Sequence, residues 1–308
     1  MNTPLQNVTI RHPRMEEAQE ITDMIQLCDI DDFGVPDITL EDLLYMWGIF
    51  SIETNAWVVC TPDSKIVGYA FLEQRGAKRM DTCVFVHPEY KNQGIGSMLL
   101  TKVEARAAEL AGELEGEQQL MNHIPFTNQA ARNLVESRGF TFSRLYKRMK
   151  IELTEEPMLA ELPEGMTIRT FVPDRDEETL YEVYDETFRD SWGYSSQNRD
   201  EWVQQQTGDQ YDPSLWFIVW DKEDPAAFLM SKLHEDGLFI DLLGVKRPWR
   251  KQGLGYALLL HAFHAAYERG QQTILLNVDS NSLTNAHYLY ERAGMRPTFQ
   301  TALYRKEI

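Results

Sequence analysis

Two short segments combine basic residues with closely spaced glycines, which is the chemistry needed to bind the diphosphate of a nucleotide. They are Arg250-Lys251-Gln252-Gly253-Leu254-Gly255 and Lys91-Asn92-Gln93-Gly94-Ile95-Gly96. Each follows an apolar run that ends in a valine, and each precedes an apolar stretch with helical periodicity. Glycines let a backbone approach an anion closely, and the free N–H groups of a first helical turn point at it. Each segment therefore predicts an anion-binding turn between a strand and a helix.

The two turns belong to a longer internal repeat. Gly94 and Gly253 stand 159 positions apart, and Gly139 and Gly294 stand 155 positions apart. A nearly constant offset between separated landmarks indicates duplication of one domain. The chain has 308 residues, which suits two domains of about 150 residues each.

The join between the two copies is predicted around residues 153–165. This stretch is acidic and contains Pro157 and Pro163, as a surface connector commonly does. The predicted organisation is an N-terminal domain at 1–152, a linker at 153–165 and a C-terminal domain at 166–308.

The composition excludes several classes of partner. A net charge of −18 opposes binding to nucleic acid or to an anionic membrane surface. No apolar run is long enough to span a bilayer, and the first residues do not resemble a signal peptide. The three cysteines are far apart and the histidines lack ligand spacing, so we expect a reducing, cytoplasmic location and no metal.

The hydrophobic pattern alternates between strand and helix signals in both copies. This order predicts an α/β (α+β) fold in each copy, with a mixed, mostly antiparallel central sheet flanked by helices. In the second copy we expect strands at 166–171, 215–220, 226–232, 238–245, 273–278 and 302–304, and helices at 177–188, 201–206, 256–268 and 285–293.

A second motif follows the second glycine turn and, together with it, resembles a known family. The residues are Val245, Pro248, Arg250, Gly253 and Gly255, then Asn285, Ala286, Leu289, Tyr290, Glu291, Gly294 and Met295. The combination is similar to the GCN5-related N-acetyltransferases (GNAT). The resemblance covers essentially the whole chain as two fused domains, an arrangement similar to that of the mycothiol synthases.

The resemblance implies that acetyl-CoA is the acetyl donor. Its pyrophosphate would lie on the second glycine turn, and its pantetheine arm would pair along the strand at 243–245. The implied contacts are Leu243, Val245, Arg250, Lys251, Gln252, Gly253, Leu254, Gly255, Tyr256, Asn281, Ser282 and Asn285. The first copy is a candidate for a second site through Val86, Lys91, Asn92, Gln93, Gly94, Ile95 and Gly96.

Tyr290 occupies the position where the family commonly places its general acid. A phenol with a pKa near ~10 can protonate a departing thiolate of similar basicity. The corresponding residue of the first copy is Val135, which cannot deliver a proton. The second copy is therefore expected to catalyse, and the first to be structural or a degenerate binding domain.

Asp241 is the candidate general base, because it is an acidic residue inside an apolar strand. An uncompensated buried carboxylate is costly, so it serves either as a base or as a paired structural carboxylate. Strand alternation puts Asp241 on one face with Phe239 and Leu243, and its counterpart in the first copy, by counting, is Thr82. Phe239 stands where a mycothiol synthase glutamate is expected, so the substrate of that enzyme is not transferred.

Asp190, Trp192 and Tyr194 are candidates for the acceptor site, because an acid and two aromatics can receive a cationic amine. Trp192 could equally cover a core. The function predicted is acetyl transfer from acetyl-CoA to a primary amine of a small molecule. A non-catalytic acyl-CoA-binding module and a protein or peptide N-acetyltransferase are the alternatives, and the chain is expected to be a monomer or homodimer.

Overall fold

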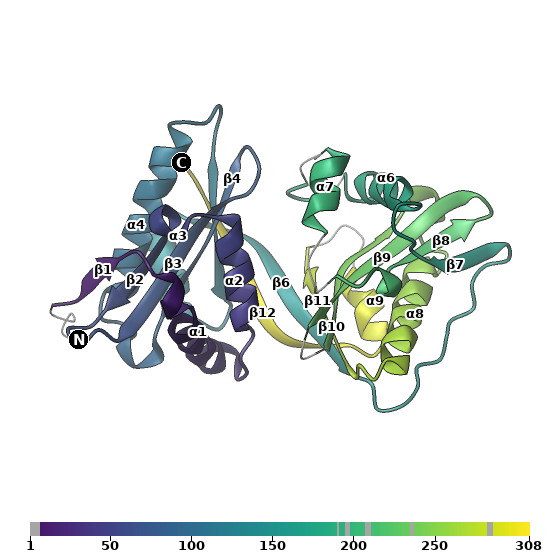
Figure 1. Ribbon diagram of the computed structural model, residues 1–308, viewed down its shortest axis with the longest axis horizontal. Helices are drawn as coiled ribbons and strands as arrows, with labels where there is room; N and C mark the ends of the chain where they lie inside the picture. Colours follow the sequence, from purple (N-terminus) through teal and green to yellow (C-terminus); the bar gives the residue numbers. More distant parts are fainter. Residues whose placement is uncertain (1–6, 190, 195–197, 207–210, 235–236, 282–285) are drawn as a thin grey trace. The chain divides into compact units, whose positions relative to one another are not determined.

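The computed structural model describes residues 7–189, 191–194, 198–206, 211–234, 237–281 and 286–308. The chain forms two compact units, which are drawn in Figure 1. The first consists of Met1–Leu145 together with Phe299–Ile308, and the second of Tyr146–Thr298. Among the described residues, no helix combines the length and the apolar character needed to span a membrane.

The first unit contains a mixed sheet with the strand order β1-β2-β3-β4-β5-β12. The strands are β1 (Thr9–Arg11), β2 (Ala56–Cys60), β3 (Ile66–Gln74), β4 (Arg79–Val86), β5 (Gln119–Pro125) and β12 (Arg296–Glu307). Neighbours pair antiparallel except β4 and β5, which are parallel. The β4–β5 pairing covers only Arg79–Thr82, so the end of β4 is left free of β5.

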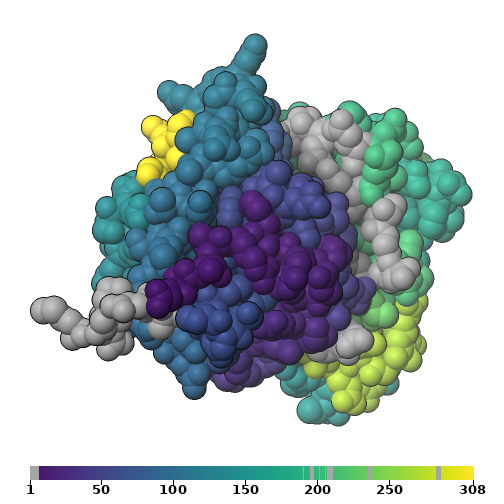
Figure 2. Space-filling model, turned by 60° about the vertical axis from the view of Figure 1, so that its left-hand side comes forward, coloured from purple at the N-terminus to yellow at the C-terminus, as the bar shows by residue number. Residues whose placement is uncertain are grey.

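Helices cover both faces of this sheet. The helices are α1 (Ala18–Phe33), α2 (Leu40–Ile49), α3 (Ile52–Asn55), α4 (Ile95–Ala111) and α5 (Gln129–Ser137), with 3₁₀ turns η1 (Met15–Glu17) and η2 (Pro88–Tyr90). Helices α1 and α2 share one apolar core with β2 and β3, and α4 and α5 share another on the opposite face. In Figure 2 the purple N-terminal segment, which includes β1 and α1, forms part of the surface of this unit.

The second unit repeats the same plan with the strand order β7-β8-β9-β10-β11-β6. The strands are β7 (Met166–Thr170), β8 (Phe217–Asp221), β9 (Asp224–His234), β10 (Gly237–Val245), β11 (Thr273–Asp279) and β6 (Thr141–Glu152). Its helices are α6 (Glu177–Phe188), α7 (Arg199–Gln205), α8 (Leu254–Glu268) and α9 (Ala286–Arg292), with 3₁₀ turns η3 (Pro213–Leu215) and η4 (Arg247–Trp249). Here α6 and α7 pack on one face, and α8 and α9 on the other.

Each sheet is completed by the last strand of the other repeat. β6, from the first repeat, pairs antiparallel with β11 of the second unit. β12, from the second repeat, pairs antiparallel with β5 of the first unit. The compact units therefore differ from the predicted ranges 1–152 and 166–308 in their final strands, and residues 153–165 contain no helix or strand.

The expected fold class is confirmed, because both sheets are mixed, mostly antiparallel and flanked by helices. Helix α6 has the predicted bounds. The final strand is much longer than predicted and runs over Arg296–Glu307 instead of 302–304. The predicted strand at 238–245 is present, but its pairing is interrupted, and this interruption shapes the site.

Candidate active site

Strand β10 carries a β-bulge at the point where it leaves β11. It pairs in parallel with β11 only over Leu238–Ile240. On its other edge, Ile240 lies opposite Ser231 and Leu242 lies opposite Met230 of β9, so Asp241 is one extra residue. A bulge re-aims a side chain and increases local twist, and bulges are frequent beside active sites.

Because of the bulge, the side chains of β10 do not alternate between the two faces as predicted. Ile240 and Leu243 both pack in the core shared with α8, although alternation would place them on opposite faces. Leu242 faces the aromatic core under α6 and α7. Asp241 therefore does not share a face with Leu243, because the extra residue shifts the period by one position.

Strand β4 of the first unit lacks this irregularity. It pairs with β3 from Gly68 to Gln74 without a register shift. Thr82 is fully buried, and its hydroxyl donates a hydrogen bond to the Phe71 carbonyl at 2.5 Å. Thr82 is thus the counterpart of Asp241 by counting only, since the bulge residue has no equivalent in the regular strand.

The Asp241 carboxylate forms an ion pair with the Lys232 ammonium of β9 at 3.0 Å. Both side chains are half-buried, with 26% and 21% of their surface exposed. The ammonium also lies 5.1 Å from the centre of the Tyr211 ring. Burial disfavours the charged lysine, but the Asp241 carboxylate and the Tyr211 hydroxyl outweigh that cost and raise the pKa of Lys232.

The second glycine turn contains two residues in the left-handed region of backbone conformation. Lys251 and Gly253 adopt left-handed φ values of 62° and 86°. Gly253 precedes the first residue of α8 and has no side chain to cap the N–H groups of the first turn. The Arg250 Nε donates a hydrogen bond to the Val245 carbonyl at 2.9 Å, which ties the turn to the end of β10.

Gly255, in the first turn of α8, marks the meeting of three elements. A Cβ on this residue would lie 3.3 Å from Leu289 Cδ2 of α9 and 3.6 Å from Val245 Cγ2 of β10. Tyr290 follows Leu289 and is 8% exposed. Burial raises the pKa of Tyr290 to about 12, and its hydroxyl makes no hydrogen bond within the described part of the chain.

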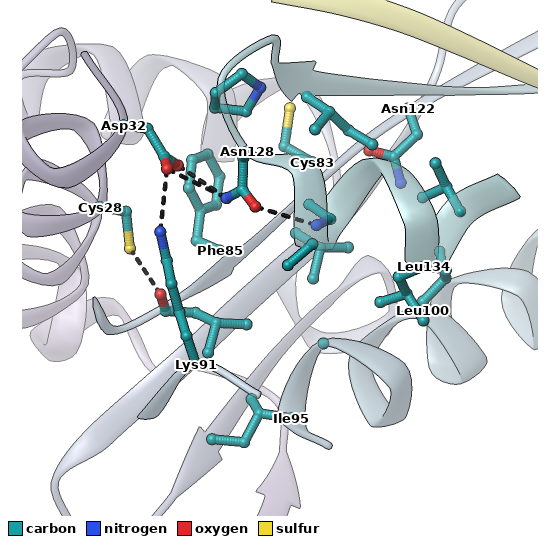
Figure 3. Close-up of a pocket in the computed structure, with 18 of the residues that line it drawn as sticks. Cys28, Asp32, Cys83, Phe85, Lys91, Ile95, Leu100, Asn122, Asn128 and Leu134 are labelled. Atoms are coloured by element: carbon teal, nitrogen blue, oxygen red, sulfur yellow. Dashed lines mark hydrogen bonds and ion pairs between the residues drawn. The ribbon is translucent and has the colours of Figure 1, made fainter. Parts of the chain in front are cut away.

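The first unit reproduces this meeting point with a different side chain. A Cβ on Gly96 would lie 3.3 Å from Leu134 Cδ2 and 3.6 Å from Val86 Cγ2, the same distances as in the second unit. Val135, at the position equivalent to Tyr290, is 3% exposed and lines a cavity of about 330 Å³. This cavity lies between the free end of β4, the glycine turn, α4, β5 and α5 (Figure 3).

Carboxylates from α1 neutralise the lysine at the mouth of this cavity. Lys91 Nζ lies 2.6 Å from Asp31 and 3.0 Å from Asp32. The Asn128 amide also donates to the Asp32 carboxylate, at 3.1 Å and 3.2 Å (Figure 3). Burial opposes the charge of Lys91, but the two carboxylates outweigh it and raise its pKa.

An aromatic layer lies between α6, α7 and the sheet of the second unit. Tyr184 stacks on Trp202 with ring centres 5.0 Å apart. Phe188 lies 5.4 Å from Tyr184 and 6.2 Å from Phe228 of β9. Burial, and the nearby Asp185 carboxylate, raise the pKa of Tyr184. Asp241 adds a smaller contribution in the same direction, which places the bulge within electrostatic reach of this layer.

The residues predicted for the acceptor site are only partly brought together. The Tyr194 hydroxyl donates a hydrogen bond to the Asp185 carboxylate, and Arg189 pairs with the same carboxylate. Trp192 is half-buried on the loop after α6 and has interaction partners of its own. Asp190 lies outside the described residues.

The remaining predicted cofactor residues fall at the start of α8. The Gln252 amide donates to the Pro248 carbonyl at 3.2 Å, within the turn. Leu254 is buried in the core. Tyr256 is half-buried, with the Arg292 guanidinium 4.3 Å from the centre of its ring.

The predicted contacts before α9 are only partly described. Asn281 is exposed, and its backbone N–H donates to the Asp279 carboxylate at 2.8 Å. Ser282 and Asn285 lie outside the described residues.

Comparison with known proteins identifies the family. Residues 177–295 match the acetyltransferase (GNAT) family, and residues 53–142 match an acetyltransferase (GNAT) domain. The chain is a tandem GNAT acetyltransferase. A GCN5-related N-acetyltransferase from Sphaerobacter thermophilus superposes with a TM-score of 0.90 at 29% identity, over 99% of this chain and 97% of that one.

Curated relatives of this tandem GNAT include mycothiol acetyltransferases. The protein of Thermobispora bispora is 28% identical over 249 residues, covering 79% of this chain and 80% of the relative. The protein of Nocardiopsis dassonvillei is 24% identical over 321 residues, covering 96% and 93%. A tandem GNAT protein from the clavulanic acid biosynthesis pathway has the same fold, with a TM-score of 0.71 at 15% identity over 98% of each chain.

The structure of the tandem GNAT adds two features that the sequence did not suggest. One is the bulge at Asp241, which is invisible because the residues of β10 are apolar on both sides of it. The other is Lys232, the partner of Asp241. Its signal was a lone lysine at the end of the apolar run Ala226–Lys232, where a solvated strand end is the ordinary interpretation.

Proposed function

We propose that the protein transfers the acetyl group of acetyl-CoA to a primary amine of a small molecule, and that the second unit catalyses the reaction. One observation carries the proposal. The bulge at Asp241 and the phenol of Tyr290 belong to the unit whose glycine turn is basic, whereas the first unit has a turn of the same backbone geometry but a regular strand and Val135 in the corresponding places.

The residues of the second unit fit acetyl-CoA. The segment from Lys246 to Gln252 contains four basic residues and no acidic one. The N–H groups at the start of α8 have no side-chain cap, so they could hold the diphosphate. Beyond Ile240, β10 has no pairing with β11, so its backbone can pair with the amides of the pantetheine arm. Gly255 lets α8 pack closely on α9 beside this strand, because a Cβ there would lie only 3.3 Å from Leu289 Cδ2.

The bound cofactor supplies the acetyl thioester, and the protein handles the protons. An amine attacks only when neutral, so the Asp241 carboxylate takes a proton from the acceptor ammonium, directly or through water. Tyr290 protonates the departing thiolate as the N–C bond forms and the C–S bond breaks. The second nitrogen proton, lost as the amide forms, restores the Tyr290 phenol through water, and Asp241 releases its proton to solvent. Because the pKa of Tyr290 is raised to about 12, the phenol is fully protonated before each turnover.

The first unit contributes structure rather than a second reaction. Its turn from His87 to Gln93 has one acidic and one basic residue, and the basic one, Lys91, is already paired with Asp31 and Asp32. A diphosphate would have to displace two carboxylates there and meet their charge. We therefore propose one tight acetyl-CoA site per chain, in the second unit.

The small-molecule acceptor draws support from the relatives. Several are mycothiol acetyltransferases that the chain covers over most of their length. Phe239 stands where that enzyme's glutamate is expected, so the similarity supports a small amine and not mycothiol's own precursor.

Calorimetric titration with acetyl-CoA tests this assignment with a matched pair of variants. Gly253 and Gly94 have φ values of 86° and 89°, and both leave room for a side chain. Glutamate therefore introduces similar backbone strain and the same repelling charge into each turn. One site per chain, lost in Gly253→Glu and kept in Gly94→Glu, is the expected result. Loss in Gly94→Glu alone would move the site to the first unit, and no binding at all would overturn the proposal.

A further inference from the structure

Three ion pairs lie where α6 faces β9 and β10 of the second unit, the side that carries the predicted acceptor residue Tyr194 and is here called the acceptor side. They are Asp185 with Arg189, Glu186 with Lys246 at 2.8 Å, and Asp241 with Lys232 at 3.0 Å. A site built for a simple cationic amine would present an uncompensated carboxylate. Here three carboxylates among the described residues, the candidate base included, already have cationic partners.

The Lys232–Asp241 pair contains the proposed base, which the acceptor nitrogen has to approach in order to lose its proton. Asp241 is the bulge residue at which β10 leaves β11. Lys232 lies on β9 directly opposite Phe239 and next to the Tyr211 ring. The pair is half-buried, so each charge depends strongly on the other.

The charge balance of this pair discriminates between classes of acceptor. A simple ammonium that binds Asp241 displaces Lys232 and leaves a half-buried ammonium without its counter-ion. An acceptor that carries both an ammonium and a carboxylate replaces one ion pair by two and leaves no charge unpaired. Separating a partly buried ion pair costs free energy when one partner is not replaced. An acceptor with both an ammonium and a carboxylate therefore binds with the smaller loss of free energy.

We propose that the acceptor is a zwitterion of the amino-acid type, with its ammonium on Asp241 and its carboxylate on Lys232; this rests on the proposed acetyl transfer in the second unit. The ammonium gives one proton to the Asp241 carboxylate. Its nitrogen then bonds the acetyl carbon as the thioester C–S bond breaks, and Tyr290 protonates the thiolate. The second nitrogen proton, lost as the amide forms, restores the Tyr290 phenol through water.

The surroundings of the pair favour an apolar substituent on the amino acid. The aromatic layer of Tyr184, Phe188 and Trp202 lies on the same face of the sheet as Leu242. Arg148 of β6 lies 5.3 Å from the centre of the Phe239 ring and donates to Asn277 at 2.7 Å. Arg148 is therefore a second cation on this face. It lies beside Phe239, the residue opposite Lys232, and we place the acceptor carboxylate there.

The test compares acceptors that differ only in their carboxylate. The probes are phenylalanine, phenylalaninamide and phenethylamine, extended to the other proteinogenic amino acids, β-alanine and the corresponding decarboxylated amines. Release of CoA thiol gives kcat/KM for each. We expect the zwitterion to exceed its decarboxylated amine by at least about tenfold, which corresponds to about 1.4 kcal/mol.

Variants of Lys232 separate charge recognition from a structural role. Lys232→Met leaves Asp241 uncompensated, so kcat/KM should fall for the zwitterion and rise for phenethylamine, reversing the preference. Lys232→Arg keeps the charge and should keep the preference. Lys102→Met removes an exposed lysine of α4 in the first unit and serves as the matched control. Acetyl-CoA binding, measured calorimetrically, shows that each variant is folded.

Each other result overturns the zwitterion assignment. If the simple amines were acetylated as well as or better than the zwitterions, and Tyr290→Phe abolished this activity, the proposed acetyl transfer would stand. Only the zwitterionic class of acceptor would then be refuted. A preference that Lys232→Met does not change would remove the role of Lys232. Absence of transfer to the whole panel also refutes the acceptor class, and the acetyl-CoA titration of Gly253→Glu then decides separately whether the cofactor site survives.

Discussion

At the scale of single residues, Tyr290 carries the most direct prediction. Tyr290→Phe removes one hydroxyl from a buried ring, so the fold and acetyl-CoA affinity should change little. Turnover should fall by about 100- to 10,000-fold, the usual contribution of a positioned general acid. Steady-state kcat measures this. Tyr267→Phe, in the same core at the far end of α8, is the matched control and should turn over like the wild type. An undiminished kcat in Tyr290→Phe would exclude the phenol as the proton donor.

The raised pKa of Tyr290 makes a second prediction, on pH. Its folded-state pKa of about 12 lies above the ordinary value of 10.0, so the neutral phenol stabilises the fold fully below pH 10, and this contribution is lost as the pH rises through about 12. For the same reason kcat should show no alkaline limb from this residue below pH 11. Ultraviolet titration of tyrosinate in the wild type and in Tyr290→Phe locates the ionisation. A tyrosine signal near pH 10 that Tyr290→Phe removes would contradict the burial argument.

At the scale of elements, the bulge on β10 allows a deletion that should abolish catalysis without unfolding the protein. Deleting Asp241 joins Ile240 to Leu242 and restores regular alternation, because Leu243 then still faces the core that it faces now. We expect the shortened strand to fold and to retain acetyl-CoA binding, while kcat falls by at least about 100-fold through loss of the base. Thermal unfolding, calorimetry and kcat measure the three quantities.

Deleting Thr82 is the matched control for this element. β4 has no bulge to absorb the loss, so the deletion turns Val84 and Val86 away from the core that they pack against. The first unit should lose at least about 2 kcal/mol of unfolding free energy. If both deletions were tolerated equally, the bulge would not be the feature that distinguishes the two strands.

How far the elements could be predicted depended on whether the signal is local. Glycine spacing and helical periodicity are local, so the turns and the bounds of α6 were accessible from the sequence. The bulge at Asp241 depends on which residue of β9 opposes it. The ion pair with Lys232 joins residues of two strands. Neither the bulge nor this ion pair can be predicted from the residues of one strand alone. Asp241 could thus be singled out as an acid in an apolar strand, but its partner could not.

At the scale of the whole molecule, the repeat could be read but the exchange of final strands could not. Leu145–Arg148 reads Leu-Tyr-Lys-Arg and Leu303–Lys306 reads Leu-Tyr-Arg-Lys. Two strands that are so alike can complete either sheet, and sequential order favours the nearer one. The structure instead pairs β6 with β11 and β12 with β5.

The exchange predicts which fragments of the chain can fold. The fragment 146–298 contains every strand of the second unit in one continuous segment, from the end of β6 to β11. We expect it to fold and to bind acetyl-CoA.

The fragment 166–308, which follows the repeat, lacks the strand that covers β11 and keeps β12 without its partner β5, so it should aggregate or remain unfolded. Circular dichroism, thermal unfolding and calorimetry on the two fragments measure the difference. Adding 1–152 to 166–308 should restore binding, since together they supply the described strands of both units. Independent folding of 166–308 with full acetyl-CoA affinity would show that β6 is dispensable for the site.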